Sequence, residues 1–312
     1  YDVGGANTKA ALVCVKKGKL LKAKVAVEYF PIWKKPEKLV EVLLKLKQQL
    51  GASSLDGVGL TMTAELSDAY QTKREGVNDI LNCVSKAFLD APIFVLDTDA
   101  ELVTLDVAKQ KPLAVAAANW AATGWLVATK LKNCVVVDVG STSTSIIPIV
   151  KSKVVALGKT DLDKLICGEL VYTGSLRTNV AAIVNSIPIR NVVAGVASEL
   201  FALSGDVHLV LDNITKEDYS SETADGRGKT MPESLARLAR VVCADTEMLT
   251  RQEIIKMAKY ISDKQIQQVA EGLSKVYSYT KSLALGKVTV VVTGLGKNFI
   301  ARKAAEKLFV AE

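Results

Sequence analysis

Apolar and polar runs alternate along the first half of the chain in the order that is typical of α/β proteins. A helical period of apolar positions covers residues 37–50 and predicts a helix there. The short apolar run 58–62 predicts a buried strand, 75–89 a second helix, and 93–96 another buried strand. This alternation predicts an α/β fold.

The second half follows a similar pattern, with more helix after its first strands. Strands are expected at residues 135–137, 146–150 and 288–292. Thr230 and Glu233 form a predicted capping box, and a second box at 262–265 is expected to open a long helix that stops at Gly286. Further helices are expected at residues 199–211 and 297–309.

Residues 113–129 form an apolar stretch without charge, which raises the question of a membrane span. The chain is 49% hydrophobic with a mean hydropathy of +0.22, both high for a soluble protein. The stretch is short for a span, rich in alanine, and contains Asn119 and Gly124. We therefore expect one helix buried between domains, and a cytoplasmic protein without a membrane segment or a secretory signal.

Charge and cysteine content exclude other classes. The formal net charge is +7, but the lysines at 16, 17, 19, 22 and 24 surround a turn without interleaved aromatic residues. This pattern favours a solvated hairpin over a nucleic-acid surface. The five cysteines include no CxxC pair, and most lie in apolar runs, so we expect buried thiols rather than disulfides or a zinc site.

The chain contains an internal repeat. It reads DVGGANTK from Asp2 and DVGSTSTS from Asp138, an offset of 138 − 2 = 136. Each copy is followed by an apolar strand and a basic turn, and the turn residues Gly18 and Ser152 are offset by 152 − 18 = 134. We expect two homologous halves, each opening with a strand that ends in Asp, a turn of small residues, and a hairpin.

Turns of this composition favour phosphate chemistry. Glycine and hydroxyl residues let backbone N–H groups approach an anion closely, and an aspartate beside them suits Mg²⁺. Asp2 and Asp138 are the predicted metal residues, facing one cleft, with Lys9 as a point charge on the phosphate. The alternative is that both motifs are only tight turns between strands. The predicted ligand-binding residues are Gly4, Gly5, Asn7, Thr8, Gly140, Ser141, Thr142, Arg177, Gly294 and Gly296.

These motifs carry a resemblance to a known superfamily. DVGGANTK, DVGSTSTS and VVVTGLGKN resemble the two phosphate loops and the adenosine loop of the actin, heat-shock chaperone and hexokinase superfamily. The resemblance implies two ribonuclease-H-like domains that flank a central cleft. We place the first at residues 1–118, with a C-terminal helix at 297–312 packing back on it, and the second, with helical insertions, at 119–296.

Longer strings are similar to the archaeal branch of the hydantoinase/oxoprolinase-like proteins. They include TMTAELSDAYQTKREGV from Thr61, GELVYTGSLRTNV from Gly168 and ELFALSGDVHLVL from Glu199. Similarity to the methanofuran-pathway members of this branch implies a transferase that uses Mg²⁺ but not ATP. Its substrates would be the phenolic amine γ-glutamyltyramine and aminomethyl-furanmethanol diphosphate, joined as an aryl ether with release of diphosphate. The enzyme is a possible homo-oligomer.

Two other function classes stay open at this stage. One is an ATP-dependent kinase or amide-ring hydrolase of the same superfamily, in which Gly294, Gly296 and Lys297 would hold adenosine. The other is a non-catalytic regulator that binds nucleotide. Both would require ATP or ADP, whereas the transferase would need only Mg²⁺ and a diphosphate.

Several polar residues are weaker candidates for the site. Glu65 follows a predicted strand and Asp206 lies near the only histidine, so both are candidate bases for the phenol proton. Arg177 would clamp an anion, or would be an ordinary surface arginine. His208 is a catalytic candidate or a buried polar residue, and Asp225 gains interest only from the resemblance.

Overall fold

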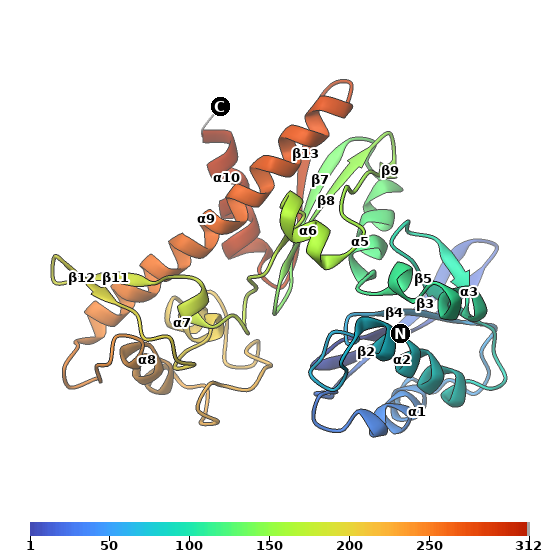
Figure 1. The fold of residues 1–312 in the computed structure, drawn as a ribbon, viewed down its shortest axis with the longest axis horizontal. Helices are drawn as coiled ribbons and strands as arrows, with labels where there is room; N and C mark the ends of the chain where they lie inside the picture. Colours follow the sequence, from blue (N-terminus) through green and yellow to red (C-terminus); the bar gives the residue numbers. More distant parts are fainter. Residues whose placement is uncertain (311–312) are drawn as a thin grey trace. The chain divides into compact units, whose positions relative to one another are not determined.

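The computed structural model describes residues 1–310, which fold into two compact units (Figure 1). The first unit contains Tyr1–Thr129 together with Lys159–Asp161, and the second contains Lys130–Gly158 and the chain from Leu162 onward. Each unit is built on a mixed β-sheet with helices packed against it. The predicted α/β class is confirmed.

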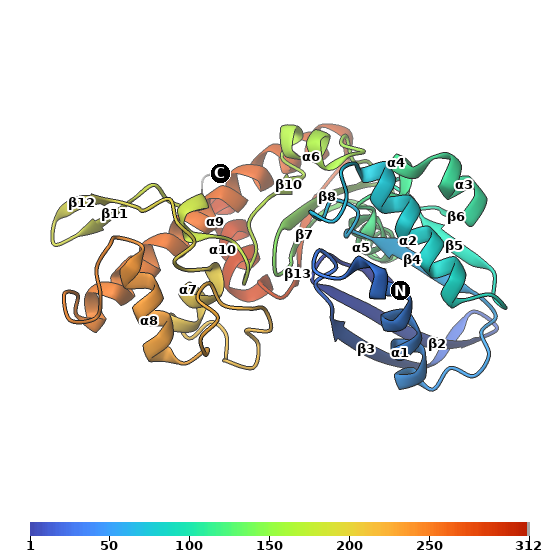
Figure 2. The same ribbon diagram turned by 60° about the horizontal axis from the view of Figure 1, so that its bottom comes forward.

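The sheet of the first unit has six strands in the order β3-β2-β1-β4-β5-β6 (Figure 2). Strands β1 to β3 form an antiparallel meander, β4 and β5 run parallel to β1, and β6 returns antiparallel. This is the arrangement expected of a ribonuclease-H-like domain. The strands are β1 (Asp2–Val3), β2 (Asn7–Lys16), β3 (Lys19–Tyr29), β4 (Val58–Met62), β5 (Ile93–Leu96) and β6 (Leu102–Thr104).

The helices of the first unit begin and end where local chemistry provides caps. Thr72 caps α2 by accepting a hydrogen bond from the backbone N–H of Glu75 at 3.2 Å, and Gly51 ends α1 in the left-handed conformation at φ 71°. The helices are η1 (Pro36–Lys38), α1 (Leu39–Leu50), α2 (Lys73–Ala87), α3 (Leu105–Gln110), α4 (Pro112–Val115) and α5 (Asn119–Ala128).

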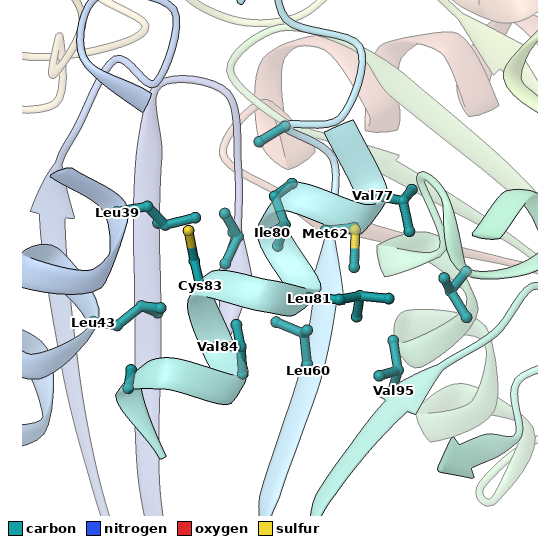
Figure 3. Packing of buried hydrophobic residues seen from close by; sticks show 14 of the residues in the cluster. Leu39, Leu43, Leu60, Met62, Val77, Ile80, Leu81, Cys83, Val84 and Val95 are labelled. Carbon is teal, nitrogen blue, oxygen red and sulfur yellow. The ribbon is translucent and has the colours of Figure 1, made fainter. Parts of the chain in front are cut away.

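The core of the first unit lies between its sheet and the helices α1 and α2 (Figure 3). Leucine side chains of α1 and the apolar face of α2 meet the side chains that β4 and β5 present on the same side of the sheet. Burial of this kind stabilises by about 25 cal/mol per Å² of apolar surface. The core residues include Leu39, Leu43, Leu60, Met62, Val77, Ile80, Leu81, Cys83, Val84 and Val95.

The second unit has a smaller sheet and more helix. Its strands follow the order β10-β8-β7-β13, β9 pairs with β8, and β11 and β12 form a separate hairpin. The antiparallel pair β7 and β8 is joined by the parallel strand β13. The strands are β7 (Cys134–Val139), β8 (Thr144–Val150), β9 (Lys153–Val154), β10 (Leu170–Val171), β11 (Ser186–Ile189), β12 (Val192–Gly195) and β13 (Thr289–Gly294).

The helices of the second unit cover its sheet and form a helical extension. Glu233 accepts a hydrogen bond from the backbone N–H of Thr230 at 2.9 Å, which confirms that capping box. The helices are α6 (Asp161–Cys167), η2 (Val180–Ala182), α7 (Ser204–Val210), α8 (Met231–Arg240), α9 (Arg251–Leu283), the π-helical turn η3 (Lys297–Ala301) and α10 (Arg302–Val310).

Two helix boundaries in the second unit differ from the prediction. The long helix α9 begins at Arg251, where Thr250 and Glu253 form the capping box, so the predicted box at 262–265 lies inside the helix. Ser262 and Gln265 are buried there because they face the core. Residues 199–203 are not helical, and α7 begins only at Ser204.

The predicted single helix over 113–129 is wrong. It is divided into α4 and α5 because Ala117 adopts the left-handed conformation at φ 50°, which no continuous helix allows. The stretch is also not buried throughout, since Trp125 and Leu126 are exposed. No described helix is both long enough and apolar enough to cross a membrane.

Two assignments of segments to domains also differ from the expectation. Helix α5 lies in the first unit, whereas the sequence places the domain boundary at residue 118. Helix α10 packs on α9 within the second unit rather than returning to the first, and it contributes Ala304 and Ala305 to that unit's core. All five cysteines are free thiols, but only Cys83 and Cys134 are buried, contrary to the expectation for the set.

The internal repeat of the sequence is also a repeat of the structure, with one copy in each unit. Asp2 pairs with Lys9 across β1 and β2, and Asp138 pairs with Ser145 across β7 and β8, seven residues apart in both cases (9 − 2 and 145 − 138). Both basic hairpin turns use left-handed residues, including Gly18 at φ 73°. Each opening strand also pairs with a parallel neighbour, β4 or β13.

Gly76→Ala is predicted to destabilise the protein, although alanine in a helix interior usually stabilises. A Cβ at position 76 would lie 2.4 Å from the carbonyl oxygen of Glu65, so α2 would have to move away from that backbone. Such overpacking typically costs about 1–3 kcal/mol, more than the roughly 1 kcal/mol gained in helix propensity. Urea denaturation measures the change.

Gly59→Ala is the matched control, because nothing lies within 4 Å of a Cβ at that position in β4. Its free energy of unfolding should equal or exceed that of the wild type. Equal stability of the two variants would contradict the close approach of α2 to Glu65.

Candidate functional site

The loop between β1 and β2 holds its carbonyl groups inward. The N–H of Gly4 donates to the carbonyl of Asn7 at 3.0 Å and closes the turn. The two central residues are Gly5 and Ala6: the amide of Phe30 donates to the carbonyl of Ala6 at 3.0 Å, and the amide of Ile32 donates to the carbonyl of Gly5 at 3.1 Å. The amides of these central residues donate to no residue in the described part of the chain. A loop whose carbonyls accept hydrogen bonds from a neighbouring segment, and whose amides have no acceptor, is suited to bind an anion.

The loop at residues 140–143 of the second unit is built in the same way. The N–H of Gly140 donates to the carbonyl of Ser143 at 2.9 Å. Three consecutive amides, 175–177, donate to the carbonyls of Gly140 and Ser141 at 2.9 to 3.0 Å. Within residues 1–310, the amides of residues 141 and 142 have no acceptor. Each repeat copy therefore presents free amides beside its aspartate.

Asp2 lies on the same side of its sheet as its strand partners Lys9 and Thr61. The Lys9 Nζ is 3.5 Å from Asp2 Oδ2. The other carboxylate oxygen, Oδ1, and the hydroxyl of Thr61 are both buried and have no hydrogen-bond partner in the described chain. Two neighbouring buried oxygens without partners indicate a group that the protein alone does not supply.

Asp138 has an equivalent setting in the second unit. Its strand partners are Ser145 and Thr293, so a threonine hydroxyl again lies beside the aspartate. Gly294 follows with φ 84°, and a Cβ there would lie 2.5 Å from Asp138 Oδ1. The N–H of Gly296 donates to the carbonyl of Val139 at 3.0 Å. The third glycine turn therefore packs directly against the second aspartate motif.

These oxygens suit a hard cation such as Mg²⁺. Carboxylate and hydroxyl oxygens are ligands of this class, and Mg²⁺ usually binds proteins through only one or two carboxylates. Among residues 1–310, no group of three or more His, Cys, Asp or Glu side chains is arranged to hold a metal. The unpartnered Oδ1 of Asp2 fits a Mg²⁺ ion that is held by only one or two carboxylates. The residues present are therefore compatible with Mg²⁺ on a phosphate ligand.

Glu65 is the most perturbed carboxyl group in the first unit. It follows β4, is 1% exposed, and neither carboxylate oxygen has a hydrogen-bond partner in the described chain. The Lys73 Nζ is 3.9 Å away and also pairs with Asp161. Burial raises the pKa of Glu65 to about 7. The nearby backbone of residues 65 and 117 and the Lys73 ammonium offset the lost hydration only in part, because none of them forms a hydrogen bond with the carboxylate.

The break between α4 and α5 places backbone next to Glu65. The amide of Ala117 is one of the few groups that stabilise the Glu65 carboxylate. Ala117 reaches this position in the left-handed conformation, which costs an alanine about 1–2 kcal/mol. Backbone strain beside a buried carboxyl with a raised pKa marks a candidate functional residue.

Asp206 is placed differently from Glu65. It is fully buried, its Oδ1 lies 2.8 Å from both Ser234 Oγ and Arg237 Nε, and its Oδ2 accepts from the N–H of Leu203 at 3.0 Å. Both oxygens are therefore occupied by donors within the fold. We do not retain Asp206 as a base, because no oxygen is open to a substrate proton.

Asp225 extends this ion-pair network. It pairs with Arg237 at 3.0 Å and with Arg240 at 3.1 Å. Partial burial opposes ionisation, yet hydrogen bonds from the backbone of Arg227 and from the two paired arginines hold the pKa of Asp225 below its usual value. The network joins α7 to α8 and explains why the sequence carries these charges.

Three other predicted residues occupy specific places. Arg177 Nη1 donates to the hydroxyl of Thr142 at 3.3 Å, so this arginine lies at the second loop. Thr8 pairs with Val3, on the opposite side of the sheet from Asp2, and its buried hydroxyl does not share the aspartate's surroundings. His208 is fully buried, and burial lowers its pKa to about 4.

Comparison with known proteins places the chain in a family. A model of the hydantoinase/oxoprolinase family matches residues 56–312. The chain belongs to this family. The match includes Glu65, the second aspartate motif and the glycine turn after β13.

Two curated relatives share the sequence of this hydantoinase/oxoprolinase family protein more closely. One, from Methanocaldococcus jannaschii, is 42% identical over 300 residues, covering 96% of this chain and 86% of the relative. The other, from Methanococcus vannielii, is 41% identical over 175 residues, covering 56% of this chain and 76% of the relative. Both are named (4-{4-[2-(γ-L-glutamylamino)ethyl]phenoxymethyl}furan-2-yl)methanamine synthase.

Solved structures are more distant from this family member. Nucleotide-free acetone carboxylase is 12% identical with a TM-score of 0.49, over 89% of this chain and 43% of that chain. The ethanolamine utilization protein EutJ from Carboxydothermus hydrogenoformans is 15% identical with a TM-score of 0.39, over 97% and 87%. Likenesses at this level add nothing to the assignment of a site.

Sequence reasoning missed Thr61 and Thr293, which pair with the two aspartates across parallel strands in this family member. A usable signal existed, because each threonine ends an apolar run, at 58–61 and 288–293, that a parallel sheet would place beside an aspartate strand. Gln265 was also missed, since it had been assigned to a helix cap. Only the structure shows that it is buried beneath the second loop.

Glu65→Gln is predicted to stabilise the protein above pH 7. Because the folded pKa of Glu65 is raised to about 7, the folded state holds this proton more tightly, and wild-type stability falls as pH rises from about 4.5 to 7. A shift of this size corresponds to roughly 3 kcal/mol. Urea denaturation at pH 5 and pH 8 should show that the free energy of unfolding of the variant exceeds that of the wild type by more at pH 8 than at pH 5.

Glu41→Gln is the control, since the side chain of Glu41 is 74% exposed. Its stability should follow that of the wild type at both pH values. Parallel pH dependence of the wild type and Glu65→Gln would show that Glu65 is ionised normally in the folded protein.

Proposed function

We propose that this protein is the transferase that joins the phenol of γ-glutamyltyramine to aminomethyl-furanmethanol diphosphate and releases diphosphate. The observation that carries the proposal is the 42% identity, over 96% of the chain, to a relative whose name describes this ether product. The geometry supports it, because each unit offers a loop of free amides beside an aspartate. Its substrates are small charged molecules, consistent with a soluble enzyme of the cytoplasm.

The reaction needs little from the protein beyond charge and position. The furan ring stabilises a cation on its attached CH₂ group, so the bond from that carbon to the diphosphate oxygen breaks readily. Negative charge then builds on the departing diphosphate, and groups aimed at it stabilise the transition state. The free amides of residues 5 and 6 in one unit or of residues 141 and 142 in the other, and the Lys9 ammonium, would provide such groups.

Asp2 and Asp138 would hold Mg²⁺, with the hydroxyls of Thr61 and Thr293 beside them. When bound, the metal would neutralise charge on the phosphate oxygens. Lys9 keeps the Asp2 carboxylate oriented through its 3.5 Å contact. Asp138 is held against Gly294, where no larger residue fits.

Glu65 is the proposed base. The phenol has a pKa near ~10, so its oxygen must lose a proton as it bonds to the furan-methyl carbon. The Glu65 carboxylate, with both oxygens unpartnered and a pKa of about 7, would accept that proton. One C–O bond breaks, one C–O bond forms, and the phenol proton moves to Glu65.

The rate is predicted to depend on Glu65 ionisation. The base acts only when deprotonated, so kcat/KM should fall as pH drops below about 7, the pKa of Glu65. Glu65→Gln should lower kcat by roughly 10²–10⁴-fold and remove this limb of the profile. An unchanged acid limb in the variant would assign it to another group.

Asp2→Asn and Asp138→Asn are each predicted to lower kcat by about 10²–10³-fold, because each removes a carboxylate that would hold Mg²⁺ on the diphosphate as it becomes more anionic. Lys9→Met should act in the same direction. The measurement is steady-state pyrophosphate release from the furan diphosphate with γ-glutamyltyramine and Mg²⁺.

Lys297→Met is the matched control, since it lies at the glycine turn where the alternative kinase function would place adenosine. It should have near wild-type turnover, and omission of ATP should change nothing. A reaction that requires ATP and forms ADP would sink the transferase proposal and support the kinase or hydrolase class.

A further inference from the structure

His208 and Gln265 are two fully buried polar residues of the second unit that the proposed chemistry does not use. His208 lies on α7 and Gln265 near the middle of α9 (Figure 1), and the two helices pack together. His208 Nε2 is 2.8 Å from Gln265 Oε1. Buried polar contacts of this kind persist when every member is satisfied.

The hydrogen-bond directions are fixed by one carbonyl group. Gln265 Nε2 lies 2.7 Å from the carbonyl oxygen of Gly174, which can only accept, and 2.8 Å from Thr173 Oγ1. The amide nitrogen must therefore face this segment, and Gln265 Oε1 must accept from His208 Nε2–H. His208 Nδ1 then accepts from Asn213 Nδ2 at 3.2 Å, which requires a neutral imidazole.

The segment that Gln265 holds is the one that supports the second anion loop. A Cβ on Gly174 would lie 2.6 Å from the backbone nitrogen of Thr142, so this glycine packs directly beneath the loop. Amides 175–177 donate to the loop carbonyls, and Thr144 Oγ1 donates to the carbonyl of Thr173 at 2.8 Å. A shift of the segment would move the loop amides that face the ligand.

We propose that His208 and Gln265 are positioning residues that hold residues 173–178 in place and thereby fix the free amides of loop 140–143 for a diphosphate. The identity of the ligand rests on the proposed function; the positioning of the loop does not. His208 acts through Gln265 and touches no substrate. Its ring also packs against the ring of Phe299 in a tilted arrangement, with 4.5 Å between centroids, which connects the glycine turn after β13 to the same network.

The first experiment measures loop order without any ligand. Hydrogen exchange of the amides of 175–177 should accelerate at least about tenfold in Gln265→Glu, because a glutamate supplies at most one donor, and none when ionised, where the Gln265 amide donates to both Gly174 and Thr173. His208→Leu should have the same effect. His208→Gln, whose amide nitrogen can take the position of Nε2, should exchange close to the wild-type rate.

Gln268→Glu is the matched control. Gln268 lies on the same helix and also donates to a backbone carbonyl, that of Ile183 at 3.3 Å, but it does not reach the 173–178 segment. It should leave exchange at 175–177 unchanged. Equal acceleration in both glutamate variants would indicate general destabilisation of α9 and would overturn the positioning role.

The second experiment measures affinity for inorganic pyrophosphate with Mg²⁺ by calorimetry. Residues that orient ligand-binding groups typically contribute about 10- to 100-fold to affinity, so Gln265→Glu and His208→Leu should weaken binding by this amount. His208→Gln and Gln268→Glu should bind like the wild type. With substrates, kcat/KM for the diphosphate should fall, since the loop binds the diphosphate before and during reaction.

The outcomes separate the two proposals. Faster exchange at 175–177 with unchanged pyrophosphate affinity would overturn the role in ligand binding. Unchanged exchange in Gln265→Glu and His208→Leu would overturn the positioning itself. A wild-type protein that binds no pyrophosphate would instead refute the proposed function, and the exchange data would still decide whether this network orders the loop.

Discussion

The structure of both candidate loops depends on backbone amides of neighbouring segments, which donate hydrogen bonds to the loop carbonyls. In the first loop the donors are residues 30 and 32, and in the second they are residues 175–177. With these carbonyls engaged, the amides of residues 5, 6, 141 and 142 have no acceptor in the described chain and stay free for an anion. A sequence of small residues alone would not ensure this, because a flexible loop could present its carbonyls instead.

The donors come from different kinds of structure in the two units. Phe30 and Ile32 directly follow β3, so the antiparallel meander itself places them beside the first loop. In the second unit, residues 173–178 follow the short strand β10 and need support from Gln265 on α9. Both repeat copies therefore have the same loop, but different segments donate the hydrogen bonds that hold it in place.

The sequence predicted the features that depend on local pattern. The strands at 58–62 and 93–96, the Thr230 capping box and the repeat register follow from short-range hydrophobic periodicity and turn chemistry. The left-handed Ala117 could not be predicted, because nothing local requires it and its amide is held near Glu65 by tertiary packing. The burial of Asp206 against Arg237 likewise depends on two helices that are distant in sequence.

Divergence between the two repeat copies bears on their chemistry. Lys9 faces Asp2, whereas Ser145 occupies the equivalent position beside Asp138, so the paired strand contributes a cation in the first copy and a hydroxyl in the second. A lysine there offsets part of the negative charge of the first aspartate, whereas a serine adds no charge at the equivalent position of the second. The two copies have thus kept the same strand register while differing in the charge that the paired strand contributes.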